Sequence, residues 1–297
     1  MDWSLQEQIT GDNGPLSGEK IIEVNPISGG CIHHAWKITL ATGEKFFAKT
    51  SSSEHYPILE SEAIGLAALN DQINKNYLII PKPLSLQKLE DTSILILPWI
   101  QLLDGNEKKL GQGLAMLHKN SSENCQKNFG WGSNAHIGLN PQIGGWRKSW
   151  GKCFVELRLR PQIDMAKKWN LYFDQEKFEA RLIKYFEEHN PEPSLVHGDL
   201  WTGNKAIDNN GKGILFDPAT WWADREVDIA MSKLFGGFSK QFYEWYEKTW
   251  RLPDGHEERV EIYNLYHLLN HANLFGGGYK SRTIESINKI NNLLKSY

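Results

Sequence analysis

The sequence predicts an α+β fold of two lobes: a small β-rich lobe over residues 1–100 and a larger, mostly helical lobe over residues 101–297. Short runs that alternate between apolar and polar residues, separated by turn residues, dominate the first hundred positions. Apolar residues at helical spacing dominate the remainder. A chain of 297 residues is longer than one typical core needs and suffices for two packed lobes. A connector is expected near residues 98–103, with a cleft wide enough for a nucleotide between the lobes.

The elements of the small lobe follow from its alternation and its turn residues. A helix is expected from Tyr56 to about Leu69, where leucines and an alanine recur at helical spacing. Glycines in residues 28–30 and 41–43 break the alternation, and Pro81 and Pro83 end the segment before them. The alternating segments predict strands over residues 20–27, 35–40, 44–50, 84–87 and 93–100.

The large lobe is expected to be helical around a short β-rich insert. The insert covers about 194–217, and the glycine- and aromatic-rich segment 128–146 is expected to be irregular. Apolar spacing predicts helices over residues 107–119, 146–169 and 178–189, and further helices from the insert to the end of the chain.

Composition excludes several classes of protein. A net charge of −3 and a pI near 6.4 give no basic footprint for nucleic acid or for an anionic membrane surface. The first ten residues are too polar for a signal peptide, and the apolar run 94–100 is too short to span a bilayer. Cys31, Cys125 and Cys153 show neither metal-ligand nor disulfide spacing, which indicates a reducing cytoplasm.

The protein is expected to be a monomer, unless Cys31 forms a disulfide between two copies. Cys31 follows a pair of glycines in a predicted turn, where an exposed thiol would allow oxidation or a redox-linked dimer. The alternative is that Cys31 is a small, inert residue.

The segment 195–204, with the sequence LVHGDLWTGN, contains a catalytic-loop pattern. The spacing His197-x-Asp199-x4-Asn204 is typical of kinases, in which the Asp orients or deprotonates a hydroxyl and the Asn holds magnesium. A short apolar strand over 213–220 then carries Asp217, where a second metal-binding carboxylate is expected. Mg²⁺ prefers oxygen ligands, which Asn204 and Asp217 supply. The alternative is a pair of unrelated polar turns beside buried strands.

Phosphate-binding candidates lie upstream. Lys49 is near the end of the third predicted strand, where a kinase carries the lysine that pairs with phosphates. Glu62, in the predicted helix, is the candidate ion-pair partner of Lys49. Its rival Glu60 lies about 160° away around the helix, so only one of the two can face inward. Gly29 and Gly30 would let backbone N–H groups approach the phosphates, although a glycine pair alone is weak evidence.

Adenine is expected at the connector. Pro98 has no N–H, so only its carbonyl can accept from the adenine amino group, while Ile100 beyond Trp99 would donate its N–H to the ring. In the large lobe, Asp228 is expected to cap a helix or to accept backbone N–H groups of the catalytic loop. His267 and His271 have the i, i+4 spacing of a metal pair but lack a third ligand, which favours packing or a substrate contact.

The chain resembles the fructosamine kinase (ketosamine-3-kinase) family over nearly its whole length. The resemblance is carried by LVHGDLWTGN, by FDPATWWADREVDIAM at 216–231 and by LLNHANLFGGGY at 268–279. Trp201 stands where protein kinases carry a lysine. The resemblance implies a bilobal protein-kinase-like fold of the aminoglycoside-phosphotransferase branch, with ATP and Mg²⁺ as cofactors. It also implies phosphorylation of the 3-hydroxyl of a ketoamine (a ribulosamine, erythrulosamine or fructosamine), free or protein-bound, which leads to deglycation.

Roles carry over residue by residue from this resemblance. Asp199 would be the base, Asn204 and Asp217 would hold Mg²⁺, Lys49 held by Glu62 would pair with phosphates, and Trp201 would form a wall of the sugar pocket. Four weaker pocket candidates, for which surface charge or core packing is the alternative, are Arg158, Arg160, Trp131 and His271. Two departures leave parts open: Pro98-Trp99 replaces a segment that is often acidic in relatives, and segment 120–145 is expected to help set substrate choice.

Two other functions are considered. A related small-molecule kinase acting on an aminoglycoside or on choline would share the same catalytic core. A pseudokinase is disfavoured, because Lys49, Asp199, Asn204 and Asp217 are all present.

Overall fold

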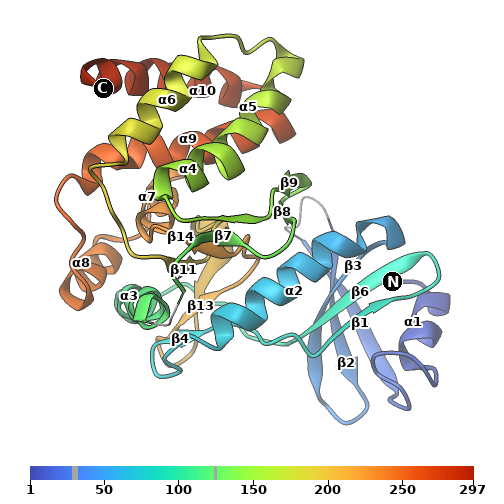
Figure 1. Ribbon diagram of the computed structural model, residues 1–297. Helices are drawn as coiled ribbons and strands as arrows, with labels where there is room; N and C mark the ends of the chain where they lie inside the picture. Colours follow the sequence, from blue (N-terminus) through green and yellow to red (C-terminus); the bar gives the residue numbers. More distant parts are fainter. Residues whose placement is uncertain (29–32, 124–125) are drawn as a thin grey trace.

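The small β-rich part of the molecule is a five-stranded antiparallel sheet with the order β1-β2-β3-β6-β5 (Figure 1). The structure is a computed structural model that describes residues 1–28, 33–123 and 126–297. The predicted strands are confirmed to within a few residues at each end. Their bounds are Ile21–Ile27 (β1), His34–Leu40 (β2), Lys45–Ser52 (β3), Ser85–Lys88 (β5) and Thr92–Pro98 (β6).

Helices cover both faces of this sheet because successive side chains of a strand point to opposite faces. On β6, Ile94 and Ile96 pack with Ile9 of helix α1 (Trp3–Thr10), whereas Leu95 and Leu97 pack against helix α2 (Tyr56–Asn70). Helix α2 was predicted, but α1 was not, because its eight residues hold too few apolar positions for a clear period.

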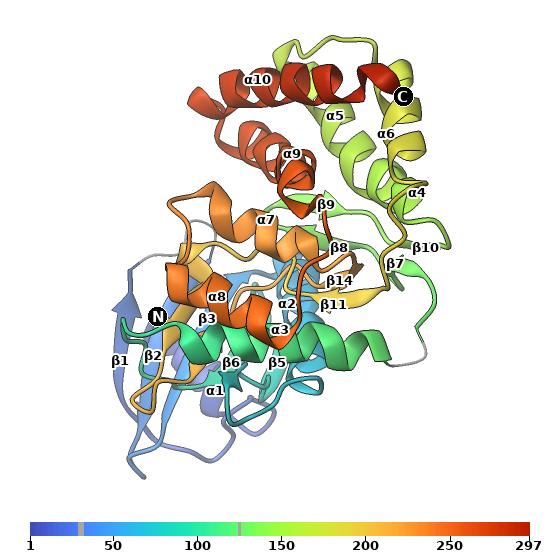
Figure 2. The same ribbon diagram turned by 90° about the vertical axis from the view of Figure 1, so that its left-hand side faces the viewer.

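The remainder of the chain is helical around short strands, as predicted. Figure 2 shows α8 lying along α3, with α7, α9 and α10 stacked beyond them. The helices are Lys108–Glu123 (α3), Trp150–Phe154 (α4), Arg160–Ala166 (α5), Gln175–Tyr185 (α6), Glu226–Leu234 (α7), Lys240–Thr249 (α8), His256–Phe275 (α9) and Gly278–Leu293 (α10).

Two expectations for this part are wrong in detail. Segment 128–146 is not irregular, since it holds the strands Phe129–Trp131 (β7), Ala135–Ile137 (β8) and Asn140–Gln142 (β9) and the start of Gly145–Arg147 (β10). Strands of three residues are too short for alternation to be recognised. The continuous helix expected over 146–169 is interrupted by a π-helical turn at Val155–Leu159, directly before the first turn of α5, where Pro161 lacks an N–H.

The strands that carry the predicted catalytic loop belong to two further sheets. Strands Ser194–Val196 (β11) and Trp221–Ala223 (β14) are antiparallel neighbours in the order β10-β7-β14-β11. Strands Lys205–Ile207 (β12) and Gly213–Leu215 (β13) form a hairpin, and Leu78–Ile79 (β4) pairs in parallel with β13. The first hundred residues therefore contribute one strand to the sheet that positions Asp217.

One apolar core joins the two parts of the chain. Side chains of α2 and β6 cluster with side chains of α3, β13 and α7, and with Leu200 of the catalytic loop. This core fixes α2 against the segment that carries the loop, and the division between residues 100 and 101 stays a prediction. None of the helices in residues 1–28, 33–123 and 126–297 combines the length and the apolarity needed to cross a bilayer.

Candidate active site

The catalytic loop is held in a sharply bent conformation after β11. Gly198 has φ +81°, and a Cβ there would lie 2.1 Å from the carbonyl oxygen of Ala219, so glycine is required. The Asn204 Nδ2 donates to the Asp199 backbone oxygen at 2.9 Å, to Asp199 Oδ2 at 3.2 Å and to the Asp217 backbone oxygen at 3.3 Å. Asp199, Asn204 and Asp217, all singled out by the sequence, thus converge.

Asp199 presents a free oxygen in a buried site. Its Oδ1 is buried and has no hydrogen-bond partner among the described residues. Burial, together with the charge of Asp217, raises the pKa of Asp199 to about 7, against the opposing hydrogen bond from Asn204. A carboxylate with a pKa near neutral can accept a proton from a hydroxyl group under ordinary conditions.

Lys49 lies between two carboxylates. Its Nζ is 2.8 Å and 2.9 Å from the two Glu62 oxygens, and it also contacts the Asp217 carboxylate. Glu60 is exposed, so Glu62 is the glutamate that faces inward. Burial acts to lower the pKa of Lys49, but the charges of Asp217 and Glu62 outweigh it and raise that pKa. Lys49 is therefore charged and held at the edge of the loop.

The oxygen donors of this site fit a hard divalent cation. Asn204 donates only through Nδ2, which leaves its Oδ1 without a partner among the described residues. The Asp217 side chain is 43% exposed. Its partial burial acts to raise the pKa of Asp217, but the charge and hydrogen bond of Lys49 keep that pKa below the ordinary value, so Asp217 carries its charge. An amide oxygen and an ionised carboxylate are ligands that Mg²⁺ accepts.

The structure describes the predicted adenine-binding connector, but the predicted glycine turn lies outside the described residues. Trp99 N–H bonds to the Lys45 carbonyl at 3.3 Å, and the Ile100 N–H has no partner in the described part of the chain. Pro98 is the last residue of β6. The arrangement leaves Ile100 free to donate to a ring, and the adenine contact itself stays a prediction. The predicted phosphate turn at Gly29 and Gly30, and Cys31 with it, lie outside the described residues.

The candidates for the sugar pocket form two groups. Trp201 and His271 lie near one another, whereas the other three contact the apolar cores or other helices. Trp201 and His271 are partly exposed and both contact Phe235, with ring centroids 6.2 Å and 4.7 Å from it. Trp131 in β7 is partly buried and packs against the apolar cores on both sides.

Arg158 and Arg160 have partners within the helical part. The π-helical turn directs Arg158 into the core, where it is 1% exposed, stacks 4.0 Å above the Trp221 ring and donates to two backbone carbonyls. Core packing, the alternative weighed for Arg158, is what the structure shows. Arg160 pairs with Glu179 of α6.

Asp228 anchors the catalytic loop, as predicted. Its two oxygens accept the backbone N–H groups of His197 at 2.7 Å and Gly198 at 2.8 Å. His118 Nε2 also lies 3.1 Å from Asp228 Oδ2. No local sequence pattern marks His118, because a single histidine in a helix acquires a role only when the fold places Asp228 beside it.

The proton positions in this network follow from its partners. Arg225 donates to the Tyr246 hydroxyl oxygen at 3.1 Å, so that hydroxyl can donate its proton to His118 Nδ1, 2.9 Å away. His118 then carries its proton on Nε2 and donates to Asp228. Burial lowers the pKa of His118, which agrees with a neutral ring.

Replacing Asp228 with Ala is expected to destabilise the fold by about 3 kcal/mol or more, at about 1–3 kcal/mol for each buried donor left without an acceptor. Burial acts to raise the pKa of Asp228, but His118 and the loop N–H groups leave it below the ordinary value. The stabilisation by ionised Asp228 is therefore complete above the unfolded pKa of about 3.9 and declines as the pH falls through the folded pKa. Urea unfolding at neutral pH and near pH 3 measures the difference, which should shrink in acid. Glu257→Gln, which alters a carboxylate 69% exposed, is the control.

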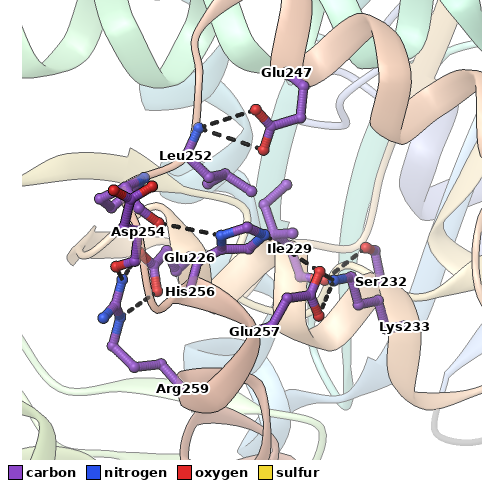
Figure 3. Close-up of polar contacts among 11 residues, drawn as sticks. Glu226, Ile229, Ser232, Lys233, Glu247, Leu252, Asp254, His256, Glu257 and Arg259 are labelled. Carbon is purple, nitrogen blue, oxygen red and sulfur yellow. Dashed lines mark hydrogen bonds and ion pairs between the residues drawn. The ribbon is translucent and has the colours of Figure 1, made fainter.

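Ion pairs attach the other side of α7 to α9. Arg259 donates to both Glu226 oxygens at 2.7 Å, and Lys233 bonds to Glu257 on the surface (Figure 3). His189, Asp224 and Glu226 have donor atoms close enough to share a metal ion. Asp224 already accepts from His189 and from Tyr263, each at 2.6 Å, and Glu226 is occupied by Arg259. This cluster is therefore a satisfied ion-pair network that anchors α7.

Comparison with known proteins gives one consistent result. A family model described as fructosamine kinase matches residues 4–294. The chain is 37% identical over 268 residues to a protein named "Probable ketoamine kinase" from Synechocystis sp., covering 89% of this chain and 88% of that protein. It is 34% identical over 286 residues to the chloroplastic protein-ribulosamine 3-kinase of Arabidopsis thaliana, covering 93% and 85%. A crystal structure of a protein from Haemophilus somnus, described as "Putative fructosamine-3-kinase", superposes with TM-score 0.83 at 27% identity, and the match covers 92% of each chain.

Proposed function

Because the chain is a kinase that belongs to the fructosamine kinase family, we propose that it transfers the γ-phosphate of ATP to the 3-hydroxyl of a ketosamine. The observation that carries this proposal is the convergence of Asp199, Asn204 and Asp217 beside the Lys49–Glu62 pair. These residue types in this arrangement serve phosphoryl transfer to an alcohol.

Each residue has a separate task in the proposed reaction. Asp199 accepts the proton of the sugar 3-hydroxyl as that oxygen bonds to the γ-phosphorus and the bond to ADP breaks. Lys49, held by Glu62, neutralises phosphate oxygens. Asn204 Oδ1 and Asp217 hold Mg²⁺, which supplies charge neutralisation to the phosphates. Asn204 Nδ2 meanwhile keeps the Asp199 carboxylate oriented toward the acceptor.

The product of this reaction is chemically unstable, which accounts for a repair role. The carbonyl at C2 acidifies the hydrogens at C1, so loss of a C1 proton expels phosphate from C3. Hydrolysis of the remaining fragment then frees the amine. The proposed enzyme would in this way reverse the attachment of a sugar to an amine.

One assay separates the proposal from its alternatives. The protein is incubated with Mg-ATP and with ribulosamines, erythrulosamines, fructosamines, an aminoglycoside or choline, and ADP release is measured. ADP release with ketosamines, and phosphate on the sugar C3 by NMR, is the expected result. Turnover only with the aminoglycoside or choline would overturn the proposal, and tight nucleotide binding without any turnover would indicate a pseudokinase.

Four finer points accompany this proposal as predictions. The ribulosamine named for the Arabidopsis relative favours a pentose-derived ketosamine as the first substrate to test. A cytoplasmic location is expected from the cysteine content, and the protein is expected to be a monomer. Cross-linking through Cys31 is checked by a non-reducing gel of wild type against Cys31→Ser.

A further inference from the structure

A set of aromatic side chains extends from the catalytic loop across the neighbouring helices. Trp201, two residues after Asp199, contacts Phe235 beyond the end of α7, and Phe235 in turn lies 4.7 Å from the His271 ring and 6.0 Å from the Tyr279 ring. His271 lies on α9 and Tyr279 on α10, and α9 packs against both α10 and α7 (Figure 2). We call this set the aromatic surface, and its members are Trp201, Phe235, His271, Phe275 and Tyr279.

The aromatic surface is accessible to a ligand. Phe275 is 55% exposed, and the other four members are partly exposed. Any ketosamine that presents its 3-hydroxyl to Asp199 places its amine only a few bonds away, beyond the sugar carbons. Because the surface begins at Trp201, the amine and its substituent would extend across it.

His271 supplies a hydrogen-bond acceptor on this surface. Its Nδ1 lies 2.9 Å from the His267 carbonyl oxygen, which can only accept, so Nδ1 carries the proton. The Nε2 of a neutral ring then accepts. Burial lowers the pKa of His271, which keeps the ring neutral near physiological pH. An acceptor among aromatic faces suits the protonated amine of a ketosamine, since ring faces attract cations.

Arg282 adds a cation at the edge of the aromatic surface. It is exposed, and its guanidinium lies 5.7 Å from the centroid of the Phe235 ring. No ion pair links Arg282 to a carboxylate within residues 1–28, 33–123 and 126–297, and Glu285, one turn along α10, pairs with Lys289 at 2.8 Å. The guanidinium is therefore available to an anionic group of a ligand, and its fork matches a carboxylate.

We propose that Arg282 and Phe235 form a subsite for the amino-acid part of ketosamines derived from free amino acids. Arg282 binds the α-carboxylate, which is attached one carbon from the amine, and the aromatic surface holds an apolar side chain. A ketosamine on a lysine side chain of a protein has no carboxylate at this position, and at a protein N-terminus that carboxyl group is an amide. This inference rests on the proposed function and narrows its substrate class.

The test compares three matched ribulosamines, made from leucine, leucinamide and isopentylamine. They share the sugar and the apolar side chain, and they carry a carboxylate, a neutral amide or neither. We expect the wild-type kcat/KM for the leucine derivative to exceed that for the leucinamide derivative by about 10- to 100-fold, the range of a charge-assisted hydrogen bond. In Arg282→Gln this ratio should fall to about one, and in Arg282→Lys it should be intermediate, because the charge remains without the fork.

Lys280→Gln is the matched control, since it removes one positive charge from the same turn of α10. Lys280 lies over the Trp169 ring, away from Phe235. This variant should keep the wild-type ratio. Equal kcat/KM for the three ribulosamines in wild type, or a preference that survives in Arg282→Gln, would overturn the inference and leave the proposed function standing. A wild-type enzyme that phosphorylates none of the three would overturn the inference, and it would overturn the proposed function as well if fructosamines and erythrulosamines also give no turnover.

Discussion

Replacing Asp199 with Asn is expected to slow phosphoryl transfer by about 10³-fold or more, equivalent to about 4 kcal/mol of activation free energy. An amide cannot accept the hydroxyl proton, although it fills the same space beside Asn204. Binding of nucleotide should persist, because Lys49 and Asp217 are unchanged. Single-turnover measurement of phosphoryl transfer, combined with calorimetric titration of ATP, separates the two effects.

The pH dependence gives this prediction a second readout. A base works only when deprotonated, so the wild-type kcat/KM should fall as the pH drops through the pKa of Asp199. That pKa is about 7 in the protein alone, where the charge of Asp217 helps to raise it. A bound cation would offset that charge, so the acid limb is expected between the ordinary Asp value of about 3.9 and about 7. The residual activity of Asp199→Asn should lack this limb, and an unchanged profile would contradict the assignment of Asp199 as the base.

Replacing Asp217 with Asn is expected to reduce kcat/KM for ATP by about 10³-fold, the scale of removing a principal electrostatic group from an active site. The variant loses a charged oxygen for Mg²⁺ and the carboxylate that contacts Lys49. Raising the magnesium concentration should recover part of the activity, since affinity for the cation is weakened. Initial rates over a magnesium titration measure this.

Asp208→Asn is the control for Asp217→Asn. Asp208 lies in the turn between β12 and β13, where its carboxylate accepts backbone N–H groups of Asn210 and Lys212. Asp208 therefore lies at the turn of the hairpin that leads to Asp217, and its carboxylate does not contact Lys49. Its replacement should leave the magnesium dependence of the rate unchanged. If Asp217→Asn and wild type share one magnesium dependence, Asp217 does not hold the cation.

The sequence is sufficient for the parts of the site that depend on local spacing. Asp199, Asn204 and Asp217 lie within one loop and one hairpin, so their separation along the chain limits their separation in space. The helical period showed that only one of Glu60 and Glu62 can face inward, and the joint pattern with Lys49 and the catalytic loop favoured Glu62. The strands of the first hundred residues were likewise predictable, since each is long enough for its alternation to be recognised.

The remaining features depend on contacts between distant segments. His118 acquires its role from Asp228, which lies far along the chain, and no local pattern marks such a pair. Arg158 was a weaker pocket candidate with core packing as its alternative, and local spacing could not show the π-helical turn that places it on Trp221. Arg282 was not singled out at all, since its position over Phe235 arises from the packing of α10 against α9.

The parallel pairing of β4 with β13 has a mechanical consequence. The chain passes from the five-stranded sheet into the helical part at β4, returns to the sheet at β5, and leaves it again after β6. Helix α2 is followed by β4, so its C-terminal end is connected to the helical part, while Glu62 in the middle of the helix faces Lys49. Movement of the five-stranded sheet relative to the helical part must therefore bend the chain at each place where it passes between them. A single proteolytic cut at residues 100–106 would leave the two parts joined through β4.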